Sequence, residues 1–180
     1  MKRLASIFIL IALASCSSVE EELKQTEALQ TKLSQADEVF QKWDFEQMKS
    51  RKKQIDERID SVSSYYKNNG LVMDMKVGLI MADFKNSGKA FKRITADYNK
   101  VKEELSFSKS QLENMATDLK AGTMEKEAMK GYLIEEKEAV DAIYAQVVKL
   151  DTIFMRSDKV YSKYAPKVDS LMATFSSPEN

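Results

Sequence analysis

Apolar residues recur every three or four positions along most of the chain, in segments that end at glycine, asparagine or proline. Residues 19–66 contain neither Pro nor Gly, and their apolar side chains form one helical stripe. This pattern predicts a long amphipathic helix over about 19–67, which ends where Gly70 supplies a left-handed cap. The stripe thins between Asp44 and Gln54, so a break or bend in that stretch is the alternative.

A helix is predicted over about 71–86 with a different pattern, because residues 71–84 are apolar on nearly every side. A helix of this kind is expected to be buried on several sides. Core packing is the favoured interpretation of its methionines, and a soft partner-binding surface at Met73, Met75 and Met81 is the alternative. The tripeptide Asn86-Ser87-Gly88 predicts a turn or kink after this helix.

Two further segments carry heptad seams, in which the spacing between seam residues alternates between three and four. They predict helices over about 88–121 and 123–164, separated by a glycine stop at Gly122. Pro166 is expected to end or kink the second helix, so a short helix over 166–175 follows before the polar tail 176–180. The first seam comprises Phe91, Ile94, Tyr98, Val101, Leu105, Ser108, Leu112, Met115 and Leu119. The second comprises Met129, Leu133, Glu136, Val140, Ile143, Val147, Leu150, Phe154, Ser157, Tyr161 and Tyr164.

A short turn between two heptad seams makes an antiparallel helical hairpin. Folding the chain about Gly122 places Ile94 opposite Phe154. We therefore predict an all-α fold, an elongated and antiparallel coiled-coil-like bundle of three helices, with a single domain over 16–175. A kink at 86–88 would make it a four-helix bundle instead.

Glu136 is the one charged residue on these seams. A functional carboxylate in a bundle core comes with partner ligands such as histidine, and the chain contains no histidine. The favoured interpretation is a polar residue that fixes the helix register, or a partly exposed end of the bundle.

The amino-terminal residues have the pattern of an export signal. Lys2 and Arg3 precede an apolar run from Leu4 to Leu13, which small residues follow. This run is shorter than the roughly 20 residues that a membrane-spanning helix needs. We therefore expect residues 1–15 to be removed from the mature protein.

The tetrad Leu13-Ala14-Ser15-Cys16 resembles the lipobox of bacterial lipoproteins. The resemblance implies cleavage before Cys16, diacylglycerol on its sulfur and acylation of the new amino terminus, and several acyl chains make a stable membrane anchor. No aspartate lies next to the cysteine, which by the same resemblance favours the outer membrane, facing the periplasm. The acidic run Glu20-Glu21-Glu22 resembles the surface-export signal of some Bacteroidetes lipoproteins, although a helix-capping box is the favoured interpretation.

Composition narrows the chemistry that the chain can perform. It contains no histidine, and its single cysteine would carry the lipid, which excludes histidine-dependent catalysis, most zinc sites and disulfides. Removal of residues 1–15 takes Lys2 and Arg3 from the 28 basic side chains and leaves the 28 acidic ones, for a net charge of about −2. The strongly basic face of a nucleic-acid-binding protein is therefore lacking. The basic run at 49–53 is flanked by acidic residues and is expected to be a solvated helix face.

These observations favour a non-enzymatic, lipid-anchored envelope protein that acts as a spacer or adaptor for a protein partner, with no cofactor or metal. Its partner-binding surface is expected at the membrane-distal end of the bundle. That surface would comprise Tyr65, Tyr66, Met73, Met75, Met172 and Phe175. The alternative is a periplasmic module that binds a small ligand or lipid in a cavity around Tyr98, Tyr161 and Tyr164.

Overall fold

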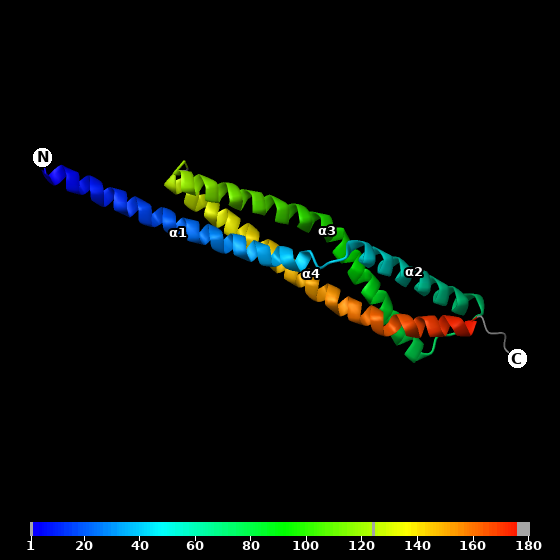
Figure 1. The fold of residues 1–180 in the computed structure, drawn as a ribbon. Coiled ribbons are helices and arrows are strands. Elements are labelled where there is room, and N and C mark those ends of the chain that lie inside the picture. The colour runs from blue at the N-terminus through cyan, green and yellow to red at the C-terminus, as the bar shows by residue number, and fades with distance from the viewer. Residues whose placement is uncertain (1, 124, 176–180) are drawn as a thin grey trace. The chain divides into compact units, whose positions relative to one another are not determined.

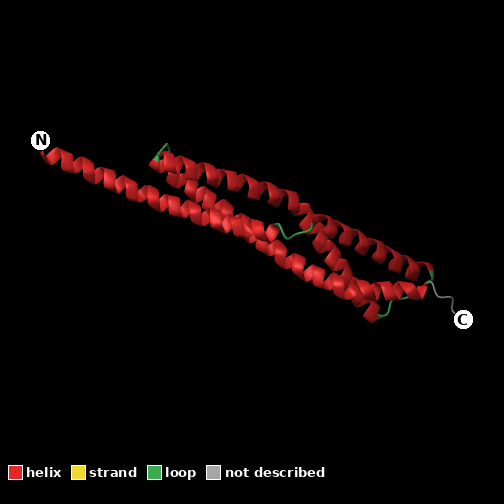
Figure 2. Cartoon of the chain, viewed as in Figure 1, coloured by secondary structure: helices red, strands yellow, loops and turns green. Residues whose placement is uncertain are grey.

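The computed structural model describes the backbone of residues 2–123 and 125–175, and the side chains of residues 19–123, 125 and 127–175. Over this part of the chain there are four helices and no strands. The helices are α1 (Lys2–Phe40), α2 (Phe45–Asn68), α3 (Met75–Ala121) and α4 (Lys126–Phe175), joined by short loops (Figures 1 and 2). The helices pack against one another, so the predicted all-α helical bundle is confirmed.

Contacts between the helices divide the chain into two compact units. The first unit contains the chain up to Phe40 together with Val101–Val148, and the second contains Gln41–Lys100 together with the chain from Lys149 onward. Each unit therefore packs three helical segments, one from α1 or α2, one from α3 and one from α4. The single domain over 16–175 stays a prediction.

The heptad seams supply the α3 and α4 part of the core in the first unit, whereas the core of the second unit comes mostly from residues outside the seams. Burying one such aliphatic or aromatic side chain stabilises the fold by about 1.5–3 kcal/mol. In the first unit the buried apolar residues of α3 and α4 are Val101, Leu105, Leu112, Met115, Leu119, Met129, Leu133, Val140, Ile143 and Val147. In the second unit the buried apolar residues are Trp43, Met48, Ile55, Val62, Met81, Phe84, Phe91, Ile94, Leu150, Ala165 and Val168.

An ion pair fixes the register of α1 against α4 in the first unit. Lys32 Nζ lies 2.7 Å from Asp141 Oδ1, 109 residues further along the chain, and also lies over the ring of Tyr144. Lys137 Nζ is 2.8 Å from the other oxygen of Asp141. Hydrogen bonds from Lys137 and Lys32 lower the pKa of Asp141 from 3.8 to about 2.

In the second unit, hydrogen bonds join α2 and the loop before it to α4. The bonded residues are separated in sequence by nearly the same number of residues as Lys32 and Asp141. Trp43 Nε1 donates to Asp151 Oδ1 at 3.0 Å, across 108 residues. Arg58 donates two hydrogen bonds to Asp169, at 2.6 and 3.0 Å, across 111 residues. These bonds raise the pKa of Arg58 and lower that of Asp169. Because the separation stays nearly constant along the helix pair, α2 runs parallel to α4.

Aromatic contacts show the pairing of α3 with α4 in the second unit. The ring centroid of Phe91 lies 6.4 Å from that of Phe154 and 6.4 Å from that of Tyr161. The sequence predicts Ile94 opposite Phe154. In the structure the ring that contacts Phe154 is that of Phe91, about one helical turn before Ile94. The antiparallel pairing is therefore within one turn of the predicted register.

The long helix predicted over 19–67 is two helices, with the break at 41–44 and not between Asp44 and Gln54. Asp44 caps α2, because its side chain accepts a hydrogen bond from the backbone N–H of Gln47 at 2.8 Å. Trp43 within the break is buried and bonded to α4. The cap satisfies one backbone N–H at the start of α2, and the indole ties the break to α4.

The turn predicted at Asn86-Ser87-Gly88 as the alternative to a kink is absent, since α3 continues through these residues as one helix. Ser87 is buried and its hydroxyl donates to the carbonyl oxygen of Phe84 at 2.6 Å. A Cβ atom built on Gly88 would lie 2.9 Å from Cγ2 of Ile55 in α2. The small residues allow α2 and α3 to approach closely, and packing outweighs their low helix propensity.

The predicted end at Pro166 is also wrong, because α4 runs from Lys126 to Phe175 with the proline inside it. A proline in a helix interior costs about 3 kcal/mol relative to alanine. Its neighbours Ala165 and Val168 are buried, and Ser170 Oγ donates to the carbonyl oxygen of Pro166 at 2.9 Å. Burial on both sides of the proline offsets the lost backbone hydrogen bond.

Both predicted glycine stops are confirmed. Gly70 and Gly122 have φ of 63° and 64°. Just beyond them, the backbone N–H of Leu71 donates to Tyr66 and that of Thr123 donates to Asp118. These are the hydrogen bonds that satisfy the last carbonyl groups of a helix at a left-handed cap.

The close approach of α2 and α3 predicts opposite effects of one substitution at two glycines of α3. Gly78→Ala should raise the free energy of unfolding by up to about 1 kcal/mol, since alanine favours helix and nothing lies within 4 Å of its Cβ. Gly88→Ala should lower it, because the new methyl group would overlap Ile55. Urea denaturation followed by circular dichroism measures both, and equal stabilisation by the two would contradict this packing.

Candidate interaction surface

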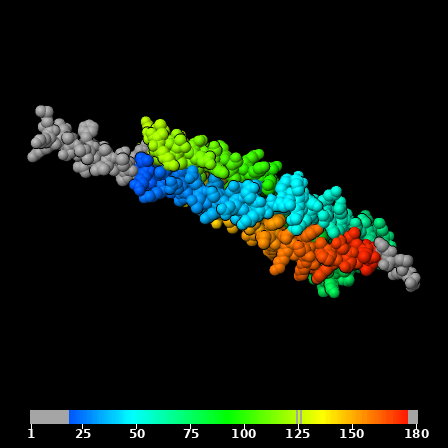
Figure 3. Space-filling view, in the orientation of Figure 1, coloured from blue at the N-terminus to red at the C-terminus, as the bar shows by residue number. Residues whose placement is uncertain are grey.

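The structure brings three of the six predicted surface residues together. The rings of Tyr65 and Phe175 are stacked, with centroids 3.7 Å apart and planes inclined by 7°. Tyr66 meets both edge-on, at 5.9 Å from Tyr65 and 6.1 Å from Phe175. All three are half-buried. The last turns of α4 (red) accordingly lie beside the end of α2 (Figure 3).

The three predicted methionines differ in exposure. Met73, in the loop before α3, and Met172, near the end of α4, are half-buried. Met75, the first residue of α3, is 82% exposed. Only Met75 therefore offers most of its side chain to a partner.

Three exposed apolar residues accompany Met75 and were missed by the sequence analysis. Leu71 is 50% exposed, Val72 is 91% exposed and Leu79 is 63% exposed. The expectation that residues 71–86 are buried on several sides is wrong for these four, although Met81 and Phe84 are buried as expected. We call Leu71, Val72, Met75 and Leu79 the 71–79 surface.

Two helix caps fix the backbone of this surface. Gly70 ends α2 in a left-handed conformation. Asp74 begins α3, because its side chain accepts from the backbone N–H of Val77 at 2.9 Å. Leu71 and Val72 lie between the caps, outside both helices. The cap residue Asp74 is the sequence signal that could have placed Leu71 and Val72 in a loop rather than in a helix.

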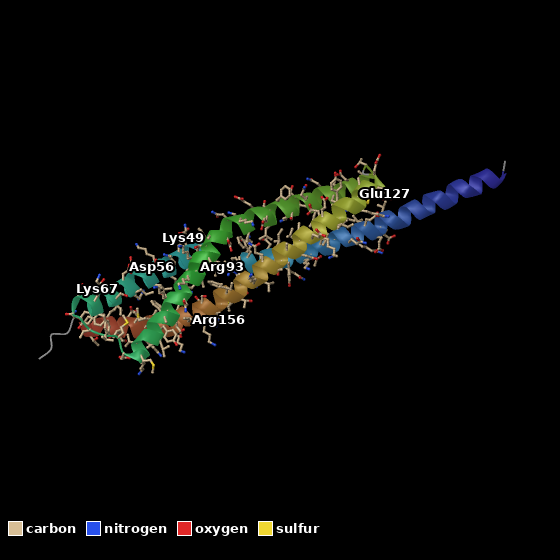
Figure 4. All side chains as sticks on the ribbon, turned by 180° about the vertical axis from the view of Figure 1, so that it is seen from behind. Lys49, Asp56, Lys67, Arg93, Glu127 and Arg156 are labelled. Carbon is tan, nitrogen blue, oxygen red and sulfur yellow. The ribbon has the colours of Figure 1, made fainter. Side chains whose placement is uncertain are left out.

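The basic run of α2 is paired within the second unit. Arg51 pairs with Asp158 and lies over the ring of Tyr161 at 5.2 Å. The lysines of the run form ion pairs with acidic residues of α2 itself. Lys49, Asp56 and Lys67 are labelled along this helix in Figure 4. These pairs are Lys49 with Glu46, Lys52 with Asp56, and Lys53 with Glu57. The run thus consists largely of intrahelical ion pairs on a solvated face.

The tyrosines expected around a ligand cavity make packing contacts. Tyr98 stacks on Phe45 with centroids 4.3 Å apart. The Tyr161 hydroxyl donates to the side-chain oxygen of Gln54, and its ring stacks on Phe84 at 5.9 Å. Lys163 and Lys167 lie over the ring of Tyr164, at 4.7 and 5.3 Å. Aromatic and cation–π packing accounts for these three positions.

The predicted lipidation site, Cys16, has its side chain outside the described residues. No helix in the described part of the chain is both long enough and apolar enough to span a membrane. Comparison with protein-family models, curated proteins and solved structures finds no match to this chain.

Proposed function

We propose that the chain is a lipid-anchored, non-enzymatic helical protein of the bacterial envelope, which acts as a spacer or adaptor and binds a protein partner through the 71–79 surface. The observation that supports the partner site is the exposure of four large apolar side chains within nine consecutive residues. Clusters of exposed apolar side chains on a folded protein mark interaction sites.

The anchor is supported by the sequence of the amino-terminal segment. A basic start, an apolar run and the tetrad ending in Cys16 follow in the order of a lipoprotein signal. Two or more acyl chains on the mature amino terminus would hold the protein at the membrane stably. The proposed location is the outer membrane, facing the periplasm.

The partner is expected to present an apolar face of its own. Leucine, valine and methionine side chains offer no directional hydrogen bonds, so the complementary surface must exclude water by packing. Methionine adapts its shape to a partner because its three side-chain bonds rotate. An amphipathic helix or an apolar groove of another envelope protein fits this chemistry.

Replacement of the anchor residue should separate attachment from folding. We expect Cys16→Ala to shift the protein from the membrane to the soluble fraction of fractionated cells, because no sulfur remains for the lipid. The helical circular dichroism of the released protein should equal that of the wild type. Retention in the membrane after this substitution would refute the lipid anchor.

Photo-cross-linking in intact cells tests the partner site. A photoreactive residue at Val72 should give one discrete adduct larger than the protein, and the additional substitution Met75→Ser should reduce it several-fold. The matched control is the same photoreactive residue at Lys92, which is exposed on α3 outside the 71–79 surface. Equal adducts from both positions, or none from Val72, would contradict the proposal, and an adduct of twice the protein's mass would identify a second copy as the partner.

A further inference from the structure

The two units carry opposite net charge. Residues 19–40 and 101–148 of the first unit contain 16 acidic and 8 basic side chains. Residues 41–100 and 149–175 of the second unit contain 18 basic and 11 acidic side chains. The near balance of charge over the whole chain therefore conceals an acidic unit and a basic unit. An asymmetry of this size favours association with a surface of complementary charge.

Helix α4 carries both signs of charge on one exposed face. It runs without interruption from Lys126 to Phe175, and successive residues of an α-helix are about 100° apart. Six exposed charged residues of α4 fall within a sector of about 40° on this geometry. We call them the α4 stripe: Glu127, Glu138, Lys149, Arg156, Lys163 and Lys167. Its acidic residues come first along the helix and its basic residues follow, as Glu127 and Arg156 show in Figure 4.

The charges of the α4 stripe are not neutralised within the described part of the chain. None of its residues forms an ion pair there. Lys163 and Lys167 lie over the ring of Tyr164, which leaves their charge in place. The three aspartates in the basic half of α4 bond donors of α2 or of the loop before it, on another side of the helix. The stripe thus presents two uncompensated charged segments to solvent.

The acidic and basic residues of the α4 stripe are placed symmetrically about Val147. Glu138 and Arg156 lie nine residues before and nine residues after it, and Glu127 and Lys167 lie 20 residues before and 20 after it. When two copies of one helix pack antiparallel about a two-fold axis at this level, residues equally distant from Val147 lie opposite each other. Each glutamate then meets a cation of the other copy, and the two-fold axis repeats each pair.

The residues near the axis permit two helices to approach. Ala145 would lie opposite Lys149, and Ala142 opposite Thr152, so no like charges meet. Both alanines are exposed, and small side chains at a contact allow helix axes to come close. A membrane surface or a nucleic acid is anionic throughout and would be repelled by Glu127 and Glu138. A second copy, in contrast, offers each half of the stripe the opposite charge.

We propose that two copies of the chain associate through the α4 stripe, antiparallel and with the two-fold axis near Val147. The contact is separate from the 71–79 surface, because the two share no residue, so neither proposal depends on the other. Met155 also lies outside the contact, about 100° round the helix from Arg156. Ion pairs between exposed side chains are individually weak and are screened by salt. The association is therefore expected to weaken as salt concentration rises.

Zero-length cross-linking with a carbodiimide tests the register. Full-length protein purified in detergent is mixed with the same protein labelled with heavy nitrogen, so that a linked peptide pair with one of each isotope must join two copies. Mixed-isotope pairs should link Glu127 to Lys167 several-fold more often than to Lys92, which is exposed on α3. Absence of mixed-isotope links between Glu127 and Lys167, or equally frequent links to Lys92, would overturn the proposal.

Charge reversal followed by rescue separates the stripe from general surface charge. Arg156→Glu should weaken self-association in analytical ultracentrifugation at least about tenfold, because each copy then places like charges opposite each other. The double variant Glu138→Lys with Arg156→Glu should restore it, since opposite charges face each other again. The control Lys92→Glu makes the same change of net charge away from the stripe and should leave association unchanged. Failure of the rescue, or an equal loss in the control, would refute the contact.

Circular dichroism establishes that each variant is folded, as expected for exposed positions. If Arg156→Glu fails to fold, Lys167→Glu and its rescue by Glu127→Lys provide the same test at the other end of the stripe. Vesicles of phosphatidylglycerol test the competing occupant. A protein that stays monomeric and binds these vesicles, with binding lost in Arg156→Glu, would overturn the dimer and identify an anionic lipid surface instead.

Discussion

The pairing of the first two helices with α4 is the constraint on which both units depend. In each unit, cationic or N–H donors of α1, α2 or the loop between them bond aspartates of α4 at a separation between 108 and 111 residues. These polar contacts are only partly buried, and the core beside them is apolar. Hydrophobic burial supplies most of the stability. The polar pairs select one alignment of the helices, since a shift would leave partly buried charges without partners.

Much of the fold could be predicted because its seams obey one period. Seam residues such as Val101, Leu112 and Val147 are buried, and the two glycine caps have the expected backbone conformation. The predicted breaks at Gly88 and Pro166 failed for one shared reason. Helix propensity is a local quantity of a few kcal/mol at most, and packing on both sides of these residues outweighs it. That packing depends on residues far away in the sequence.

The candidate surface was predicted only in part, for a related reason. The stacking of Tyr65 on Phe175 follows from the parallel pairing of α2 with α4, which sequence periodicity alone does not give. The exposure of Val72 and Met75 contradicts the burial expected from an apolar run. An apolar run has the same composition whether a neighbouring helix or a separate partner covers it.

The central claim is that a partner covers the 71–79 surface in the envelope, and methionine oxidation measures this directly. Met75 and Met155 are 82% and 62% exposed in the second unit, whereas Met48 is fully buried. Peroxide treatment followed by mass spectrometry should oxidise Met75 and Met155 rapidly in the purified protein and leave Met48 protected. In native membranes, the oxidation rate of Met75 should fall several-fold relative to that of Met155. An unchanged ratio of the two rates in membranes would contradict the account.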